Sequence, residues 1–205
     1  MSARAYRTHR AASVRRRRLG VLTAIAVIAL AVVWLVPRID HAVRDLTLPL
    51  QDAGIIRAEA AQKHLDPALI AAVIFAETKF NARTSPTGAE GLMQIEPATA
   101  EYLAHLSGGY DFNVSDLWTP SVNVAYGSYY LRYLLDHFGG NEMLAVAAYN
   151  GGMANVDQWV AAARAHGSEL RIADIPFPET RAYVTRVLQA QRDYRADYGA
   201  QLGLS

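Results

Sequence analysis

The chain has 205 residues, contains no cysteine and carries a formal net charge of +1. This length has room for one ordinary domain plus an appendage, and the lack of cysteine excludes disulfides and thiolate metal sites. The charge is unevenly divided, because the residues beyond Val36 carry 13 Lys and Arg against 19 Asp and Glu, a charge of −6. A basic face for binding nucleic acid is therefore excluded from that part of the chain.

The first element in chain order is a candidate membrane segment. Residues 1–18 contain seven arginines and no acidic residue, and residues 19–36 (LGVLTAIAVIALAVVWLV) carry no charge. This apolar run reaches the lower limit of a membrane-spanning helix and exceeds the ~7–15 residues of a signal-peptide core. The arginines predict a basic cytoplasmic N-terminus, one transmembrane anchor at 19–36 and an extracytoplasmic remainder. The alternative is a cleaved signal peptide ending near Ala29-Leu30-Ala31, which the length of the run disfavours.

After a connector at 37–49, the rest of the chain has the pattern of one helical domain over 50–199. Apolar residues at helical spacing predict helices at 50–64, 67–79, 97–106, 121–138, 141–149, 154–166 and 179–198. Asp66 before Pro67 is a helix start signal, and Gly139-Gly140 is a stop signal. No alternating run is long enough to predict a strand, so we expect an all-α (mainly α) fold.

Glu77 is the most unusual residue of the predicted helix at 67–79. It follows Val73 by four positions and Ile74 by three, so it continues their apolar face near the helix C-terminus. Burial and the negative end of the helix dipole both raise the pKa of a carboxyl group. A general acid that works near neutral pH requires such a pKa. The alternative is a glutamate whose stem packs while its carboxylate reaches water.

Two loops hold further candidate residues. The first, SPTGAEGLMQ at 85–94, contains Gly91, Met93 and Gln94, and the second, AAYNGG at 147–152, contains Tyr149 and Asn150. Turn chemistry and helix termination can explain both loops without a functional role. The tyrosines at 126, 129, 130 and 133 are expected to divide between core and groove. The six histidines show no paired metal-binding spacing such as HExxH, so no metal is predicted.

Three segments in order carry a family resemblance: AETKFNARTSPTGAEGLMQIEPATA, AAYNGG and IPFPETRAYVTRVL. Together they resemble the soluble-type lytic transglycosylases, and the resemblance covers about residues 50–198. It implies a goose-type lysozyme fold and a bacterial enzyme, whose catalytic domain the predicted anchor at 19–36 would place outside the cytoplasm. It also implies cleavage of the MurNAc–GlcNAc β-1,4 bond of peptidoglycan strands without water, leaving a 1,6-anhydro-muramoyl end. Neither a cofactor nor a metal is implied.

By the match of these motifs, the resemblance implies a role for each candidate residue. Glu77 becomes the catalytic acid and base, Tyr149 and Asn150 lie near the scissile bond, and the groove wall contains Ser85, Gly91, Met93 and Gln94. Glu179 supports the site from the last helix, or it is only a first-turn glutamate that the helix dipole favours. The sequence departs from the family pattern in three ways: Thr78 stands where Ser is common, Glu96 stands where Met is common, and Ser85 follows Glu77 by eight residues, one fewer than is typical.

Only one carboxylate lies on a predicted buried face, whereas most glycosidases flank the bond with two. One group suffices if the substrate supplies the nucleophile, here the muramoyl C6 hydroxyl, whose proximity lets it compete with water. Two alternatives remain open. A lysozyme-type hydrolase would use the same glutamate with water, and a non-catalytic peptidoglycan-binding module would keep the groove without needing the acid.

Overall fold

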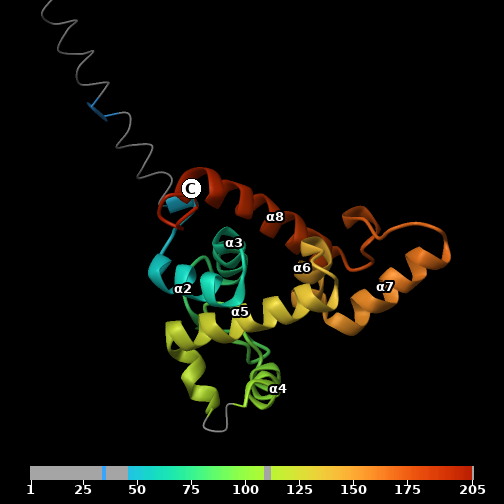
Figure 1. Cartoon of the computed structure of the whole chain (residues 1–205), viewed down its shortest axis with the longest axis horizontal. Coiled ribbons are helices and arrows are strands. Elements are labelled where there is room, and N and C mark those ends of the chain that lie inside the picture. The colour runs from blue at the N-terminus through green and yellow to red at the C-terminus, as the bar shows by residue number, and fades with distance from the viewer. Residues whose placement is uncertain (1–33, 36–45, 109–111, 205) are drawn as a thin grey trace, which may run out of the picture. The chain divides into compact units, whose positions relative to one another are not determined.

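Figure 1 shows a computed structural model, in which the described residues are 34–35, 46–108 and 112–204. Contacts divide the chain into Met1–Thr47 and Leu48–Ser205, and the second unit is described here by itself. The predicted anchor at 19–36 lies outside the described residues except for Trp34 and Leu35. Within the described ranges, no helix combines the length and the apolar character that a membrane span requires.

The Leu48–Ser205 unit is built mainly of helices, as predicted. They are α2 (Ala53–Lys63), α3 (Pro67–Thr78), α4 (Pro97–Ser107), α5 (Pro120–His137), α6 (Glu142–Gly151), α7 (Met153–Ala165) and α8 (Pro178–Tyr198). Two short 3-10 helices, η1 (Val114–Trp118) and η2 (Ile172–Asp174), were not predicted. The helix start at Asp66 is confirmed, because its carboxylate accepts a hydrogen bond of 3.0 Å from the backbone N–H of Ala68.

The domain also contains one short hairpin, which was not predicted from the sequence. Strands β1 (Arg83–Thr84) and β2 (Glu90–Gly91) pair antiparallel, with Arg83 opposite Gly91 and Thr84 opposite Glu90. Each strand has only two residues, which is too short for an alternation of apolar and polar side chains to predict it. This hairpin connects α3 to α4, and it contains most of the first candidate loop.

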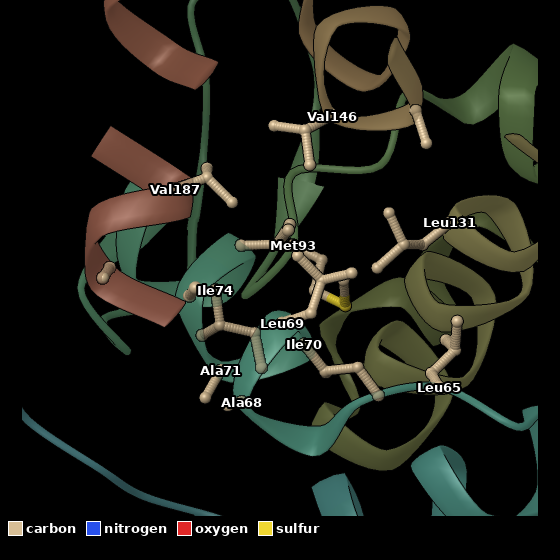
Figure 2. Close-up of a cluster of buried hydrophobic side chains, with 14 of the residues drawn as sticks. Leu65, Ala68, Leu69, Ile70, Ala71, Ile74, Met93, Leu131, Val146 and Val187 are labelled. Atoms are coloured by element: carbon tan, nitrogen blue, oxygen red, sulfur yellow. The ribbon is translucent and has the colours of Figure 1, made fainter. Parts of the chain in front are cut away.

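Helix α3 is the central element of the core. Every residue from Ala68 to Ile74 is buried, so the helix has no single buried face, in contrast to the one apolar face expected from sequence. Its main packing partner is α8. Figure 2 shows the α3 side chains in one cluster with residues from the loop before α4 and from α5, α6 and α8, labelled Met93, Leu131, Val146 and Val187. This packing fixes the position of the C-terminal end of α3, where Glu77 lies.

Candidate functional site

A cavity of about 380 Å³ opens at the C-terminal end of α3. Helices α4, α5, α6 and α8 and the hairpin contribute the rest of its wall, together with the loops beside them. Six of the eight predicted site residues line it, namely Glu77, Ser85, Gln94, Tyr149, Asn150 and Glu179. They come from segments up to about one hundred positions apart in the sequence. The fold therefore brings the three motifs to one place.

A second cavity of about 410 Å³ lies between α2, α4 and α5. Its lining includes Lys63, Tyr126 and Tyr129 but no carboxylate side chain. The two cavities are similar in size, but the second contains none of the predicted site residues and no acid. The cavity at Glu77 is therefore the candidate active site.

The Glu77 side chain is half-buried and receives a hydrogen bond from the last helix. The hydroxyl of Tyr183, itself 2% exposed on α8, donates to Oε1 of Glu77 over 2.6 Å. Burial raises the pKa of Glu77, and this effect outweighs the Tyr183 hydrogen bond and the charges of Arg186 and Arg83, which lower it. The net direction agrees with the prediction from sequence. Glu77 therefore holds its proton to a higher pH than an exposed glutamate.

Arg83 also closes the C-terminal end of α3. Its guanidinium donates a hydrogen bond of 2.5 Å to the backbone carbonyl of Glu77, one of the carbonyls that a helix end leaves without an intrahelical partner. Beside it, Thr78 is 2% exposed and donates through its hydroxyl to the Leu92 carbonyl over 2.8 Å. The hydroxyl at position 78 therefore ties the hairpin loop to α3, a role that the Ser common in the family can also fill.

Gly91 does not line the cavity, and the structure gives a packing reason for a glycine there. Its φ is +78°, and an added Cβ would lie 2.1 Å from Nδ2 of Asn123 and 2.6 Å from the Leu117 carbonyl. Asn123 is fully buried on α5. Its Nδ2 donates to the carbonyls of Glu90 and Leu117, and its Oδ1 accepts from the Met93 N–H over 2.8 Å. This amide fixes the hairpin to the helical core.

Met93 does not line the cavity either, because its side chain is fully buried in the core. The absence of a side chain at Gly127 makes room for it, since a Cβ there would lie 2.3 Å from the Met93 sulfur. The backbone carbonyl of Met93 accepts a hydrogen bond of 2.9 Å from the hydroxyl of Tyr149. Met93 therefore does not contact the groove as expected. Its backbone carbonyl instead holds the Tyr149 hydroxyl in place.

The neighbouring tyrosine Tyr149 is kept neutral. Its pKa is raised well above the ordinary value, first by burial and then by the charges of Glu77 and Tyr130. Its ring packs against that of Tyr130 at 5.3 Å between centroids, and Tyr130 also lines the cavity. The Tyr149 hydroxyl therefore donates its hydrogen bond to the Met93 carbonyl, and its oxygen remains available as an acceptor beside Glu77.

Asn150 is oriented by α8. Its Oδ1 accepts a hydrogen bond of 2.8 Å from the hydroxyl of Thr180, which is 2% exposed. Among the described residues, no acceptor for Nδ2 of Asn150 is recorded. An amide held in this way offers its N–H groups to a ligand in the cavity. The adjacent Glu179 is exposed, lies in the first turn of α8 and also lines the cavity.

Ser85 and Gln94 hold the loop that forms one wall. The Ser85 hydroxyl accepts hydrogen bonds from the N–H groups of Thr87 and Ala89 at 3.2 and 2.9 Å. Gln94 has a φ of +50°, and its Nε2 donates to the carbonyls of Arg83 and Gly91 at 2.7 and 2.9 Å. Both side chains therefore shape the wall at the same time as they line it.

Sequence reasoning missed four residues that hold the site: Thr78, Asn123, Thr180 and Tyr183. Tyr183 and Thr180 lie within the segment IPFPETRAYVTRVL, but their roles depend on the packing of α8 against α3 and α6. No spacing along one helix reveals such contacts. In the described part of the chain, no group of three or more His, Cys, Asp or Glu residues is arranged to hold a metal ion.

Comparisons with known families and proteins agree with this arrangement. The profile of the family described as "Transglycosylase SLT domain" matches residues 54–172. The soluble lytic murein transglycosylase of Escherichia coli K12 is 32% identical over 151 residues, covering 72% of this chain and 23% of that protein. The transglycosylase of Enterobacteria phage PRD1 is 36% identical over 132 residues, covering 63% and 46%. A membrane-bound lytic murein transglycosylase F from Pasteurella multocida is 33% identical over 99 residues, covering 45% and 18%.

Two solved structures resemble this one over most of the chain. An inactive mutant of the lytic transglycosylase Slt from Pseudomonas aeruginosa has a TM-score of 0.69 and 32% identity, covering 77% of this chain and 26% of that one. The 70-kDa soluble lytic transglycosylase of Escherichia coli has a TM-score of 0.69 and 30% identity, covering 78% and 26%. The present chain therefore spans about a quarter of the length of these larger proteins.

Proposed function

Because the chain belongs to the transglycosylase SLT domain family, we propose that it is a peptidoglycan lytic transglycosylase. It cleaves the MurNAc–GlcNAc β-1,4 bond and leaves a 1,6-anhydro-muramoyl end, in bacterial cell-wall remodelling. The observation that carries this proposal is the half-buried carboxyl of Glu77, whose pKa is raised by desolvation, in a cavity lined by phenol and amide groups. The names of its relatives support the same substrate class.

In the first step, the Glu77 carboxyl donates its proton to the bridging oxygen as the bond between that oxygen and muramoyl C1 breaks. The leaving GlcNAc departs with a free O4 hydroxyl. The raised pKa keeps Glu77 protonated for this task. The hydrogen bond from Tyr183 to Oε1 leaves Oε2 as the oxygen that carries the proton toward the substrate.

Positive charge then develops at muramoyl C1, and the substrate's own N-acetyl oxygen stabilises it. The N–H groups of Asn150 are proposed to hold this acetamido group, since Thr180 already occupies the amide oxygen. Tyr149 accepts a hydrogen bond from the acetamido N–H, because its own proton is engaged by Met93. Ser85, Gln94 and Glu179 are proposed to contact the flanking sugars from the wall.

In the second step, the Glu77 carboxylate takes the proton of the muramoyl C6 hydroxyl as O6 forms a bond with C1. Glu77 is thereby reprotonated and the ring closes without consuming water. The two other carboxylates of the cavity, Glu96 and Glu179, are both exposed. Both are more exposed than the half-buried Glu77, which supports a mechanism with a single acid and base rather than a carboxylate pair.

We also propose that residues 19–36 anchor the protein in the cell membrane, with the catalytic domain outside the cytoplasm. The eighteen-residue uncharged run and the seven arginines before it support this topology. Proteins similar to this chain include one described as soluble and one described as membrane-bound.

Product analysis tests the reaction. The full-length protein is incubated with purified peptidoglycan, and the released muropeptides are identified by mass spectrometry. A lyase releases anhydro-muramoyl ends, which are lighter by one water than the reducing ends that a hydrolase produces. Reducing muramic ends would establish the hydrolase alternative. Binding of peptidoglycan without release of any muropeptide would establish the binding-module alternative.

A further inference from the structure

Four tyrosines form a row that leads from the cavity outward across α5 and α4. The row starts with Tyr149 and Tyr130, which both line the cavity and whose ring centroids are 5.3 Å apart. Tyr133 follows Tyr130 by three positions on α5, so the two lie on the same face of that helix. The ring of Tyr133 then contacts Tyr102 of α4, with 6.2 Å between centroids.

Helix α4 also contributes to the cavity wall and carries the second member of the Tyr102–Tyr133 pair. Glu96 and Thr99, at the start of α4, line the cavity, and Tyr102 lies three positions beyond Thr99 on the same face. In Figure 1, α4 lies below α5. Both helices therefore extend the cavity wall by about one turn, and Tyr102 and Tyr133 stand at the end of the two extensions.

The Tyr102–Tyr133 pair is fixed before any ligand arrives. The two rings meet edge to face at 77°, and their hydroxyl oxygens are 3.3 Å apart. Tyr102 nevertheless remains 50% exposed, and Tyr133 is half-buried. The pair adjoins two residues that line the cavity, because Tyr133 follows Tyr130 by three positions on α5 and Tyr102 follows Thr99 by three on α4.

We propose that Tyr102 and Tyr133 form a platform that binds the glycan strand outside the cavity, on a sugar beyond those flanking the scissile bond. This inference rests on the proposed function. A cavity of about 380 Å³ has the size that suits a small ligand, so a polymer bound there must continue over the adjoining surface. Sugar rings pack their C–H faces on aromatic rings and need partners for their hydroxyls, and a half-exposed tyrosine pair offers both.

The platform makes the enzyme sensitive to strand length, which kinetics can measure. Full-length wild type, Tyr102→Ala, Tyr133→Ala and the double variant are assayed on defined MurNAc–GlcNAc strands, from the shortest that is cleaved to strands several disaccharides longer. We expect the double variant to lose about fivefold or more in kcat/KM on long strands, through KM. Its kcat, and its kcat/KM on the shortest strand, should equal those of wild type. Tyr102→Phe keeps the ring and should retain most of the length dependence.

Tyr126→Ala is the matched control. Tyr126 lies on the same helix and is also half-buried, but it lines the second cavity. Its replacement should leave the length dependence unchanged. If wild type and the folded double variant show the same ratio of long-strand to short-strand kcat/KM, the platform is excluded. Should the double variant fail to fold, Tyr102→Ala alone decides, because this side chain is half exposed.

A binding measurement separates failure of this inference from failure of the proposed function. The affinity of the Glu77→Gln protein for the same long and short strands is measured with and without the Tyr102→Ala and Tyr133→Ala substitutions. Selective loss of long-strand affinity supports the platform even if no anhydro product is ever found. Equal losses on both lengths, or no loss, contradict it even in an active lyase.

Discussion

Two opposing effects act on the pKa of the Glu77 carboxyl group. Burial raises its pKa, whereas the hydroxyl of Tyr183 and the charges of Arg186 and Arg83 lower it. A fully isolated buried carboxyl would hold its proton too strongly to return it to a substrate, and a fully exposed one would lose it below neutral pH. Tyr183 and the arginines thus adjust a pKa that burial alone would set higher.

Replacing Tyr183 with Phe should shift the pH dependence of the reaction. The hydrogen bond from Tyr183 favours the carboxylate, so its loss raises the pKa of Glu77 further. Because the first step needs protonated Glu77, the alkaline limb of kcat/KM should move to higher pH. Tyr194→Phe is the control, since this α8 hydroxyl donates to the distant Pro49 carbonyl. An alkaline limb unmoved in Tyr183→Phe would contradict the proposed link.

The same pKa predicts how Glu77 affects stability. A folded-state pKa raised above the ordinary value of 4.5 means that the folded protein is more stable with Glu77 protonated than with Glu77 as a carboxylate. This contribution is fully present below pH 4.5 and is lost as the pH rises through the folded-state pKa. Glu77→Gln, which carries no charge, should therefore unfold at a higher denaturant concentration than wild type at pH 8, and the difference should shrink at pH 4.

Chemical denaturation at the two pH values measures this effect. Glu101→Gln, on the exposed face of α4, serves as the control for removing one negative charge. A stability difference between Glu77→Gln and wild type that is independent of pH would show that burial does not disfavour the Glu77 carboxylate.

Sequence reasoning identified Glu77 but not the residues that hold it. The carboxylate near the end of an apolar helix is a local pattern, and one helix suffices to reveal it. The contacts of Tyr183 and Thr180 cross from α8 to α3 and α6, and those of Asn123 cross from α5 to the hairpin. Tertiary packing determines which polar groups meet, and no spacing within a single element contains that information.

At the scale of elements, the helices were largely predictable and the hairpin was not. Start signals such as Asp66-Pro67 and stop signals such as Gly139-Gly140 act locally, so the structure confirms them. The all-round burial of α3 was missed because alanines such as Ala71 and Ala72 do not indicate a face by themselves. The hairpin depends on Gly91 and Asn123, whose contact spans about thirty residues of sequence.

Gly91→Ala should destabilise the protein strongly. The added methyl group would overlap the Asn123 side chain and the Leu117 carbonyl, at a backbone φ of +78° that alanine disfavours. We expect a loss of about 3 kcal/mol in the free energy of unfolding, which combines backbone strain with overpacking. Gly88→Ala is a matched control, because Gly88 has a φ of +90° but no atom within 4 Å of the added Cβ. It should lose only about 1–2 kcal/mol. Equal losses in the two variants would contradict the proposed clash.

At the scale of the whole molecule, the candidate active-site cavity is assembled from motifs distant in sequence. Glu77, Asn150 and Glu179 belong to three helices that meet only in the folded chain. Their order in the sequence was enough to indicate the family. It was not enough to show that Met93 and Gly91 support the cavity without lining it.

The proposed topology makes a separate prediction for the whole chain. A reporter enzyme fused after Ser205 should be active only outside the cytoplasm, and the protein should be recovered with membranes, because the apolar run at 19–36 follows seven arginines. Cell fractionation with reporter assays measures both properties. Recovery of a soluble exported product that begins near Val32 would instead establish a cleaved signal peptide.

The most direct test of the central claim is the activity of Glu77→Gln. The substitution keeps the shape and hydrogen-bonding capacity of the side chain but removes the proton that titrates. Release of anhydro-muropeptides by the folded, full-length variant, quantified by mass spectrometry, should fall by about 10²–10⁴-fold or more, the range typical of losing general acid–base catalysis. Release at a rate near that of wild type would contradict the account, and Glu77 would then be an ordinary glutamate at the end of a buried helix.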